Sequence, residues 1–257
     1  MTYLVNPRHY TRDEFRTLVD GLTWGKGWRP DFPTLHNTGV PSLTQWIGYG
    51  TTAKERWGAS LNRYYQGLGW HSGPHLVCCP DYIWNLCDLE QDGVSVSCWN
   101  RLTVGIEMVG DFRASGDSPF SGEGAKVIDN AVWALAILAN KLEWSIGNVQ
   151  TGVRGLHFHR ECTNDHHACP GDLVNKSEII GRVVCAMKTL GAARAPTPVP
   201  SSPVASLLPP SPPTDPVALR KWVQREVGVN DDGDIGDESI AAIAAFIAMH
   251  TAIAKAA

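Results

Sequence analysis

The pattern of apolar and polar residues predicts several helices. Residues 125–142 carry apolar side chains at the period of an α-helix. These side chains belong to Ile128, Val132, Leu135, Leu138 and Leu142. Residues 52–68 and 172–190 are also predicted to be helical, and Thr11-Arg12-Asp13-Glu14 has the form of a capping box that begins a short helix.

Short apolar segments between these helices are typical of β-strands. They are residues 33–37, 75–79, 82–86, 103–109 and 156–159. Pro80-Asp81 separates the second from the third and predicts a hairpin, and Glu107 is the one carboxylate in the fourth. Strands that alternate with helices predict an α/β fold with a mixed central β-sheet flanked by helices.

A proline-rich segment divides the chain. Nine of the 22 residues from Ala195 to Pro216 are proline. Such a segment favours extended polyproline geometry and cannot pack a core. We therefore predict a large domain over residues 1–194, a linker over 195–215, and a small all-α module over 216–257.

Composition limits the partners and the compartment. The formal net charge of −4 provides no basic surface, so we expect no nucleic-acid partner. No apolar run reaches the roughly 18 residues of a membrane span, so we expect no stable membrane association. The first residues lack the apolar core of a secretory signal. The seven cysteines, among them the adjacent Cys78 and Cys79, do not resemble a disulfide framework, which favours synthesis in a reducing compartment.

The segment from His157 to Gly171 holds an unusual number of candidate metal ligands, four histidines and two cysteines. Imidazole nitrogens and thiolate sulfurs bind zinc, and a catalytic zinc site requires three protein ligands and one open position. A further ligand can come from His36, which lies early in the chain. The alternative is a polar, histidine-rich surface loop.

Four motifs share an order along the chain. They are His36 at the end of a predicted strand, Gly73-Pro74-His75-Leu76-Val77 at the hairpin, Trp99-Asn100 followed by Gly105-Ile106-Glu107-Met108-Val109-Gly110, and His159 ten residues before Cys169-Pro170-Gly171. With these motifs, residues 30–185 resemble the zinc-dependent N-acetylmuramoyl-L-alanine amidase family, which includes phage endolysins and peptidoglycan recognition proteins.

The resemblance implies that His36, His159 and Cys169 bind one Zn²⁺. Two imidazoles and a thiolate can hold a tetrahedral ion and leave one position for water. His157 competes with His159, because side chains two residues apart on a strand share a face. The ten-residue spacing to Cys169 favours His159.

The resemblance also implies the catalytic residues. Glu107 occupies the position of a general base in one branch of the family, whereas another branch uses a tyrosine from the hairpin, where this chain has Pro74. A salt bridge on the strand face is the alternative role for Glu107. His167 stands where many relatives have a lysine that stabilises the oxyanion, and the adjacent His166 could substitute for it. His75 is expected to be a hydrogen-bonded structural histidine rather than a ligand.

The C-terminal module has its own resemblance. Residues 219–236 resemble a small helical peptidoglycan-binding module. Its acidic loop lacks the glutamate spacing of a calcium-binding EF-hand. The alternative is a pair of helices used for dimerisation.

These features predict a peptidoglycan hydrolase that cleaves the amide bond between N-acetylmuramic acid and L-alanine. We expect a monomeric, phage-type endolysin that stays in the host cytoplasm without a signal peptide and acts on bacterial peptidoglycan after the membrane is breached. One alternative is a non-catalytic recognition protein that binds muropeptide. Another is a structural zinc domain, in which His157 or His167 would close the fourth position.

Overall fold

The computed structural model describes residues 3–24, 27–147, 155–162 and 168–192 of the 257-residue chain. The chain divides into two units, Met1–Ala195 and Pro196–Ala257, and the fold below is that of the first unit. The linker predicted over 195–215 and the module predicted over 216–257 lie outside the described residues.

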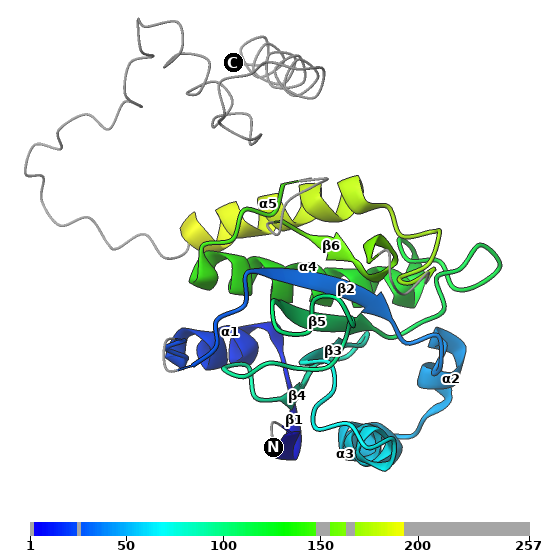
Figure 1. Cartoon of the computed structure of the whole chain (residues 1–257). Coiled ribbons are helices and arrows are strands. Elements are labelled where there is room, and N and C mark those ends of the chain that lie inside the picture. The colour runs from blue at the N-terminus through cyan, green and yellow to red at the C-terminus, as the bar shows by residue number, and fades with distance from the viewer. Residues whose placement is uncertain (1–2, 25–26, 148–154, 163–167, 193–257) are drawn as a thin grey trace, which may run out of the picture. The chain divides into compact units, whose positions relative to one another are not determined.

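A mixed sheet forms the centre of this unit, and within the described residues it has six strands in the order β1-β4-β3-β5-β2-β6 (Figure 1). The strands are β1 (Tyr3–Tyr10), β2 (Phe32–Asn37), β3 (Leu76–Cys78), β4 (Ile83–Cys87), β5 (Thr103–Met108) and β6 (His157–Phe158). The pairs β1/β4 and β4/β3 are antiparallel, whereas β3/β5, β5/β2 and β2/β6 are parallel. The predicted α/β fold with a mixed central sheet is confirmed.

Helices cover the sheet. They are α1 (Arg12–Gly21), α2 (Leu43–Gly48), α3 (Thr51–Gly67), α4 (Gly122–Leu142), α5 (Lys176–Ala192) and the short 3₁₀ helix η1 (His159–Glu161). Helix α4 contacts β3, β4 and β5 and lies between α1 and α5, and Figure 1 shows α4 and α5 running side by side. Helix α3 contacts β1 and β4 instead. The apolar side chains of α4 are largely buried, so this helix holds much of the core.

The register of the parallel strands sorts their side chains onto two faces. Leu35 of β2, Ile106 of β5 and Leu76 of β3 are partners across the sheet, and all three are completely buried. The next residue of β2 and of β5 faces the opposite way, because side chains alternate along a strand. His36 therefore pairs with Glu107 on the other face of the sheet.

Most predicted elements are present, with a few corrections. Thr11 caps α1 in a reciprocal capping box with Glu14, as predicted. Strand β1 and helix α2 were not predicted, so His36 lies on the second strand rather than the first, one residue before its end. The strand predicted over 156–159 is limited to β6, and the chain turns into η1 at His159.

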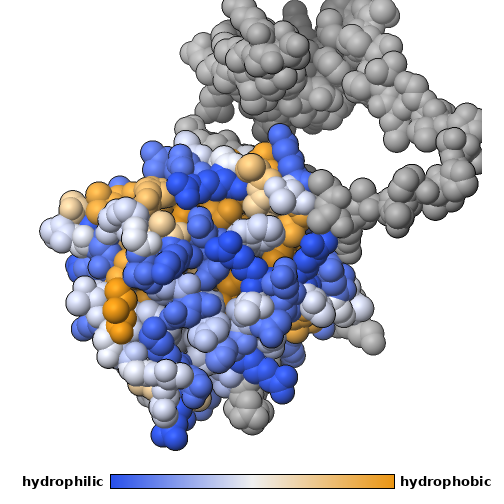
Figure 2. All heavy atoms as spheres, turned by 180° about the vertical axis from the view of Figure 1, so that it is seen from behind, coloured by the Kyte–Doolittle hydropathy of each residue, from blue (hydrophilic) through white to orange (hydrophobic). Residues whose placement is uncertain are grey.

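The surface of the unit is mixed in character. On the face shown in Figure 2, hydrophilic residues predominate and hydrophobic residues gather in separate small groups. Among the described helices, none is long and apolar enough to cross a membrane.

Candidate metal and active site

The structure brings the three predicted metal ligands together. One ligand atom from each of His36, His159 and Cys169 lies within 4.8 Å of the other two. The imidazole rings of His36 and His159 are 4.7 Å apart between centroids. His36 and Cys169 are buried, at 2% and 4% exposure. Within the described part of the chain, this is the group that could hold a metal ion.

The sheet explains why these residues meet. Strands β2, β5 and β6 are parallel neighbours, so their carboxyl ends lie at the same edge. His36 lies near the carboxyl end of β2, and His159 follows β6 directly. The segment that carries Cys169 is fixed to the same place by two backbone hydrogen bonds. Arg160 N–H donates to the Cys169 carbonyl at 2.9 Å, and Leu173 N–H donates to the Phe112 carbonyl at 3.1 Å.

Glu107 lies beside this group. Its Oε1 is 3.9 Å from His36 Nδ1, and its side chain is 15% exposed. Its Oε2 is buried and has no hydrogen-bond partner among the described residues. Burial raises the pKa of Glu107 to about 8, because desolvation penalises the ionised carboxylate. In the described ranges, the ion-pair partner of Glu107 is His36, its neighbour across the two strands, and the pair is charged only when the imidazole is protonated.

Cys169 has the surroundings of a ligand that needs a cation. Desolvation raises the pKa of its thiol, and the nearby carboxylate of Glu107 raises it further. The Asn37 backbone N–H donates to Sγ at 3.2 Å, which lowers the pKa but does not outweigh burial. A thiol in this setting is deprotonated by a coordinated metal ion. Two imidazoles and one thiol therefore form a donor set that fits zinc.

His157 and His159 have different roles in the structure. His157 lies outside the ligand group, and its Nδ1 is 3.0 Å from Glu161 Oε2. Glu161 in turn accepts hydrogen bonds from Lys176 Nζ at 2.8 and 3.0 Å. The ring of His157 packs against Phe32, with 4.7 Å between ring centroids. Of the two competing histidines, His159 is the one that lies beside His36 and Cys169.

Among the remaining predicted residues, His75 is completely buried and hydrogen-bonded, as expected. Its Nε2 is 2.9 Å from the Gln91 carbonyl oxygen, and its Nδ1 accepts from the Gly105 N–H at 3.2 Å. Nδ1 therefore carries no proton, and burial lowers the pKa of His75 to about 4. His166 and His167 lie outside the described residues, and the catalytic role of His167 stays a prediction.

The structure also contains a disulfide that the sequence analysis missed. Cys98 and Cys162 are bonded, with their Cα atoms 6.4 Å apart, and the other five cysteines are free thiols. The expectation that the cysteines form no disulfide framework is therefore wrong for this pair. The two residues are 64 positions apart, and neither lies in a spacing pattern that would have identified the pairing. The bond ties Cys162, which follows η1, to the segment that carries Trp99.

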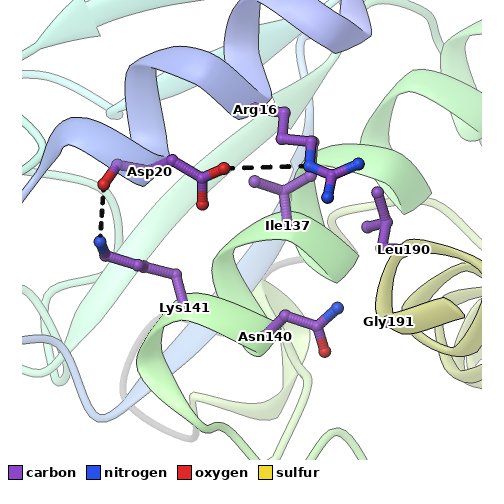
Figure 3. A pocket seen from close by; sticks show the side chains of 7 residues that line it. All are labelled: Arg16, Asp20, Ile137, Asn140, Lys141, Leu190 and Gly191. Atoms are coloured by element: carbon purple, nitrogen blue, oxygen red, sulfur yellow. Dashed lines mark hydrogen bonds and ion pairs between the residues drawn. The ribbon is translucent and has the colours of Figure 1, made fainter. Parts of the chain in front are cut away.

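The unit also has a cavity that is not lined by the candidate metal ligands or by Glu107. It has a volume of about 170 Å³ and lies between α1, α4 and the end of α5 (Figure 3). Its two cationic side chains both interact with Asp20. Arg16 Nε is 3.9 Å from the Asp20 carboxylate, and Lys141 Nζ donates to the Asp20 carbonyl at 2.9 Å. The reactive side chains thus lie at the strand ends, away from this cavity.

Several solved structures are similar to this chain. N-acetylmuramoyl-L-alanine amidase LysC from Clostridium intestinale URNW is 17% identical, and the match covers 64% of this chain and 94% of that one, with a TM-score of 0.43. Wild-type PGRP-LB from Drosophila is 20% identical, with coverages of 65% and 89% and a TM-score of 0.44. The hydrolase AmiA from Staphylococcus aureus, solved with its ligand, is 12% identical, with coverages of 65% and 77% and a TM-score of 0.43.

The comparisons based on sequence identify no relative. No protein-family model and no curated protein matches the chain. At the identities and TM-scores above, neither the activity nor the ligands of the similar structures can be transferred to this chain on similarity alone. The function is therefore inferred from the residues and the geometry of the site.

Proposed function

We propose that this chain is a zinc-dependent N-acetylmuramoyl-L-alanine amidase that hydrolyses bacterial peptidoglycan. The observation that carries the proposal is the convergence of His36, His159 and Cys169, with the carboxylate of Glu107 beside them. Three ligands from protein side chains leave one position for a reactant, as in catalytic rather than structural zinc sites. A zinc ion held there would supply Lewis-acid chemistry, polarising the scissile carbonyl and lowering the pKa of water.

The protein's own groups account for the proton transfers. Hydrolysis adds the oxygen of water to the carbonyl carbon and breaks the bond from that carbon to nitrogen. Glu107 takes a proton from the attacking water and passes it to the leaving nitrogen. Its elevated pKa suits both steps, because a base that must also return the proton works best when its pKa is near the operating pH. His167 remains the proposed donor to the developing oxyanion.

The proposal extends to the biological setting. A Pro-rich linker over 195–215 would join the catalytic unit to a peptidoglycan-binding module over 216–257. A chain with this organisation acts as a phage-type endolysin that reaches the wall after the membrane is breached.

The test uses purified peptidoglycan and the full chain. An amidase releases free peptide amines and creates no new reducing sugar ends. Activity should disappear in a chelator and return with added zinc. Activity that survives complete removal of zinc contradicts the mechanism. Zinc binding without turnover of a soluble muropeptide would instead favour a recognition protein.

A further inference from the structure

Arg160 connects the two chain segments that carry His159 and Cys169. It follows His159 in η1, and its backbone N–H donates to the Cys169 carbonyl at 2.9 Å. Its guanidinium group donates to the Gly171 carbonyl at 2.8 Å and to the Val174 carbonyl at 3.4 Å. A single residue therefore makes three hydrogen bonds to the segment from Cys169 to Val174.

The side chain of Arg160 is held in place by packing as well. The guanidinium carbon lies 4.9 Å from the centre of the Phe158 ring, and Phe158 is completely buried. A planar guanidinium presents several donors in a fixed geometry and stays charged at all working pH values. A lysine would offer a mobile point charge in the same place, so it cannot reproduce the fork of donors.

We propose that Arg160 is a positioning residue that sets the separation of His159 and Cys169 and so pre-assembles the metal site before zinc binds. The inference rests on the proposed zinc site. Its evidence is the set of three hydrogen bonds from Arg160 to the segment from Cys169 to Val174. Loss of the guanidinium removes the two side-chain hydrogen bonds to Gly171 and Val174, whereas the backbone bond from Arg160 to Cys169 and the bond from Leu173 to Phe112 remain.

The experiment compares Arg160→Met, Arg160→Lys and a control, Arg182→Met, in the full chain. Methionine keeps an apolar stem over Phe158 and removes the two guanidinium hydrogen bonds to Gly171 and Val174, whereas the backbone bond to Cys169 is kept. Arg182 is a matched control, because its guanidinium carbon, like that of Arg160, lies over an aromatic ring, at 5.2 Å from the centre of the Phe120 ring. Arg182 forms an ion pair with Glu178 on α5. The dissociation constant for zinc is measured by competition with a chromophoric chelator. Cobalt(II) is the second probe, since its visible absorption reports thiolate ligation and tetrahedral geometry.

Arg160→Met should weaken zinc binding about 10- to 100-fold, the usual effect of removing a group that orients metal ligands. Its cobalt spectrum should lose intensity in the thiolate-to-metal band. Arg160→Lys should recover part of the affinity, and Arg182→Met should match the wild type. A merely structural role of Arg160 predicts a loss of folding stability in Arg160→Met, with the zinc affinity and the cobalt spectrum of the folded protein unchanged.

The inference is overturned if folded Arg160→Met binds zinc within about threefold of the wild type with an unchanged cobalt spectrum. If Arg160→Met does not fold, Arg160→Lys provides the test. Zinc affinity of Arg160→Lys equal to that of the wild type would then overturn the inference. The outcome is separate from that of the proposed function. A wild-type chain that binds no zinc defeats the proposed function, whereas a zinc-binding chain with an unaffected Arg160→Met defeats the positioning role alone.

Discussion

Replacing Glu107 by glutamine separates catalysis from stability. Glutamine keeps the size and shape of the side chain but cannot accept a proton. We expect turnover on peptidoglycan to fall by about 10²- to 10⁴-fold, the usual contribution of a general base. Zinc content should remain at about one ion per chain, because Glu107 does not belong to the ligand group.

Stability of the metal-free protein should change in the opposite direction. Burial raises the pKa of Glu107 from 4.5 to about 8, so the folded state favours the protonated carboxyl. The stability that this preference provides is fully present below pH 4.5 and is lost as the pH rises through 8. At pH 7.5 the loss is about 4 kcal/mol, from roughly 1.4 kcal/mol for each pH unit above 4.5. Glutamine does not ionise. The free energy of unfolding of Glu107→Gln, relative to that of the wild type, should therefore rise by about 4 kcal/mol between pH 4 and pH 7.5.

Two assays check these expectations. Amine release by zinc-loaded protein gives the turnover, and urea unfolding in the presence of a chelator gives the free energy of unfolding at each pH. Glu123→Gln is the control, because Glu123 pairs with Lys126 on the exposed surface of α4, where ion pairs contribute little. A fall in turnover below about tenfold, which is about 1.4 kcal/mol of barrier, would move the base role away from Glu107. A difference in the free energy of unfolding between Glu107→Gln and the wild type that stays constant from pH 4 to pH 7.5 would refute the electrostatic reasoning.

Three further predictions concern other parts of the unit. His159→Ala should lose bound zinc while His157→Ala retains it, as metal analysis of the purified proteins can show; the reverse pattern would assign the ligand role to His157. The pKa of His75 is lowered to about 4 from 6.5, so its contribution to stability is present above pH 6.5 and lost as the pH falls through 4. The difference in unfolding free energy between the wild type and His75→Gln should therefore shrink by about 3 kcal/mol from pH 7 to pH 4, and a constant difference would contradict the shift. Replacing both Cys98 and Cys162 by serine should reduce the free energy of unfolding by about 4 kcal/mol, because the disulfide closes a loop with a sequence separation of 64; equal stability of the double variant and the wild type in urea would show that the bond does not constrain the unfolded chain.

Local signals identified most of the elements. The capping box at Thr11 and the apolar period of α4 both depend on residues close in sequence, so they could be recognised without the fold. Helix α2 carried such a signal too, since Ser42 and Gln45 form a capping box, but the helix is short. Strand β1 contains Pro7 and polar residues and has no clear alternation. It lies at the edge of the sheet, where a proline is tolerated.

The candidate site was predictable only in part. The choice of His159 over His157 came from its spacing to Cys169, because both histidines fit the same strand pattern. The structure separates them, since β6 ends at Phe158 and the chain turns into η1. The role of Arg160 could not be predicted from the sequence pattern. Its hydrogen-bond partners are backbone carbonyls, and their positions depend on the turn after Cys169. Contacts of this kind cannot be inferred from residue types alone.

The chemistry of the site and the stability of the metal-free fold oppose each other. Burial raises the pKa of both Glu107 and Cys169, so it penalises the charged forms that catalysis and metal binding need. A divalent cation held by His36, His159 and Cys169 would offset this penalty, because it favours both the thiolate and the nearby carboxylate. Under the proposed function, zinc affinity and folding stability would be linked in this unit, because any ligand that binds only the folded state raises its stability. Because of this linkage, a loss of activity in a site variant identifies a catalytic role only when zinc occupancy and folding are measured at the same zinc concentration.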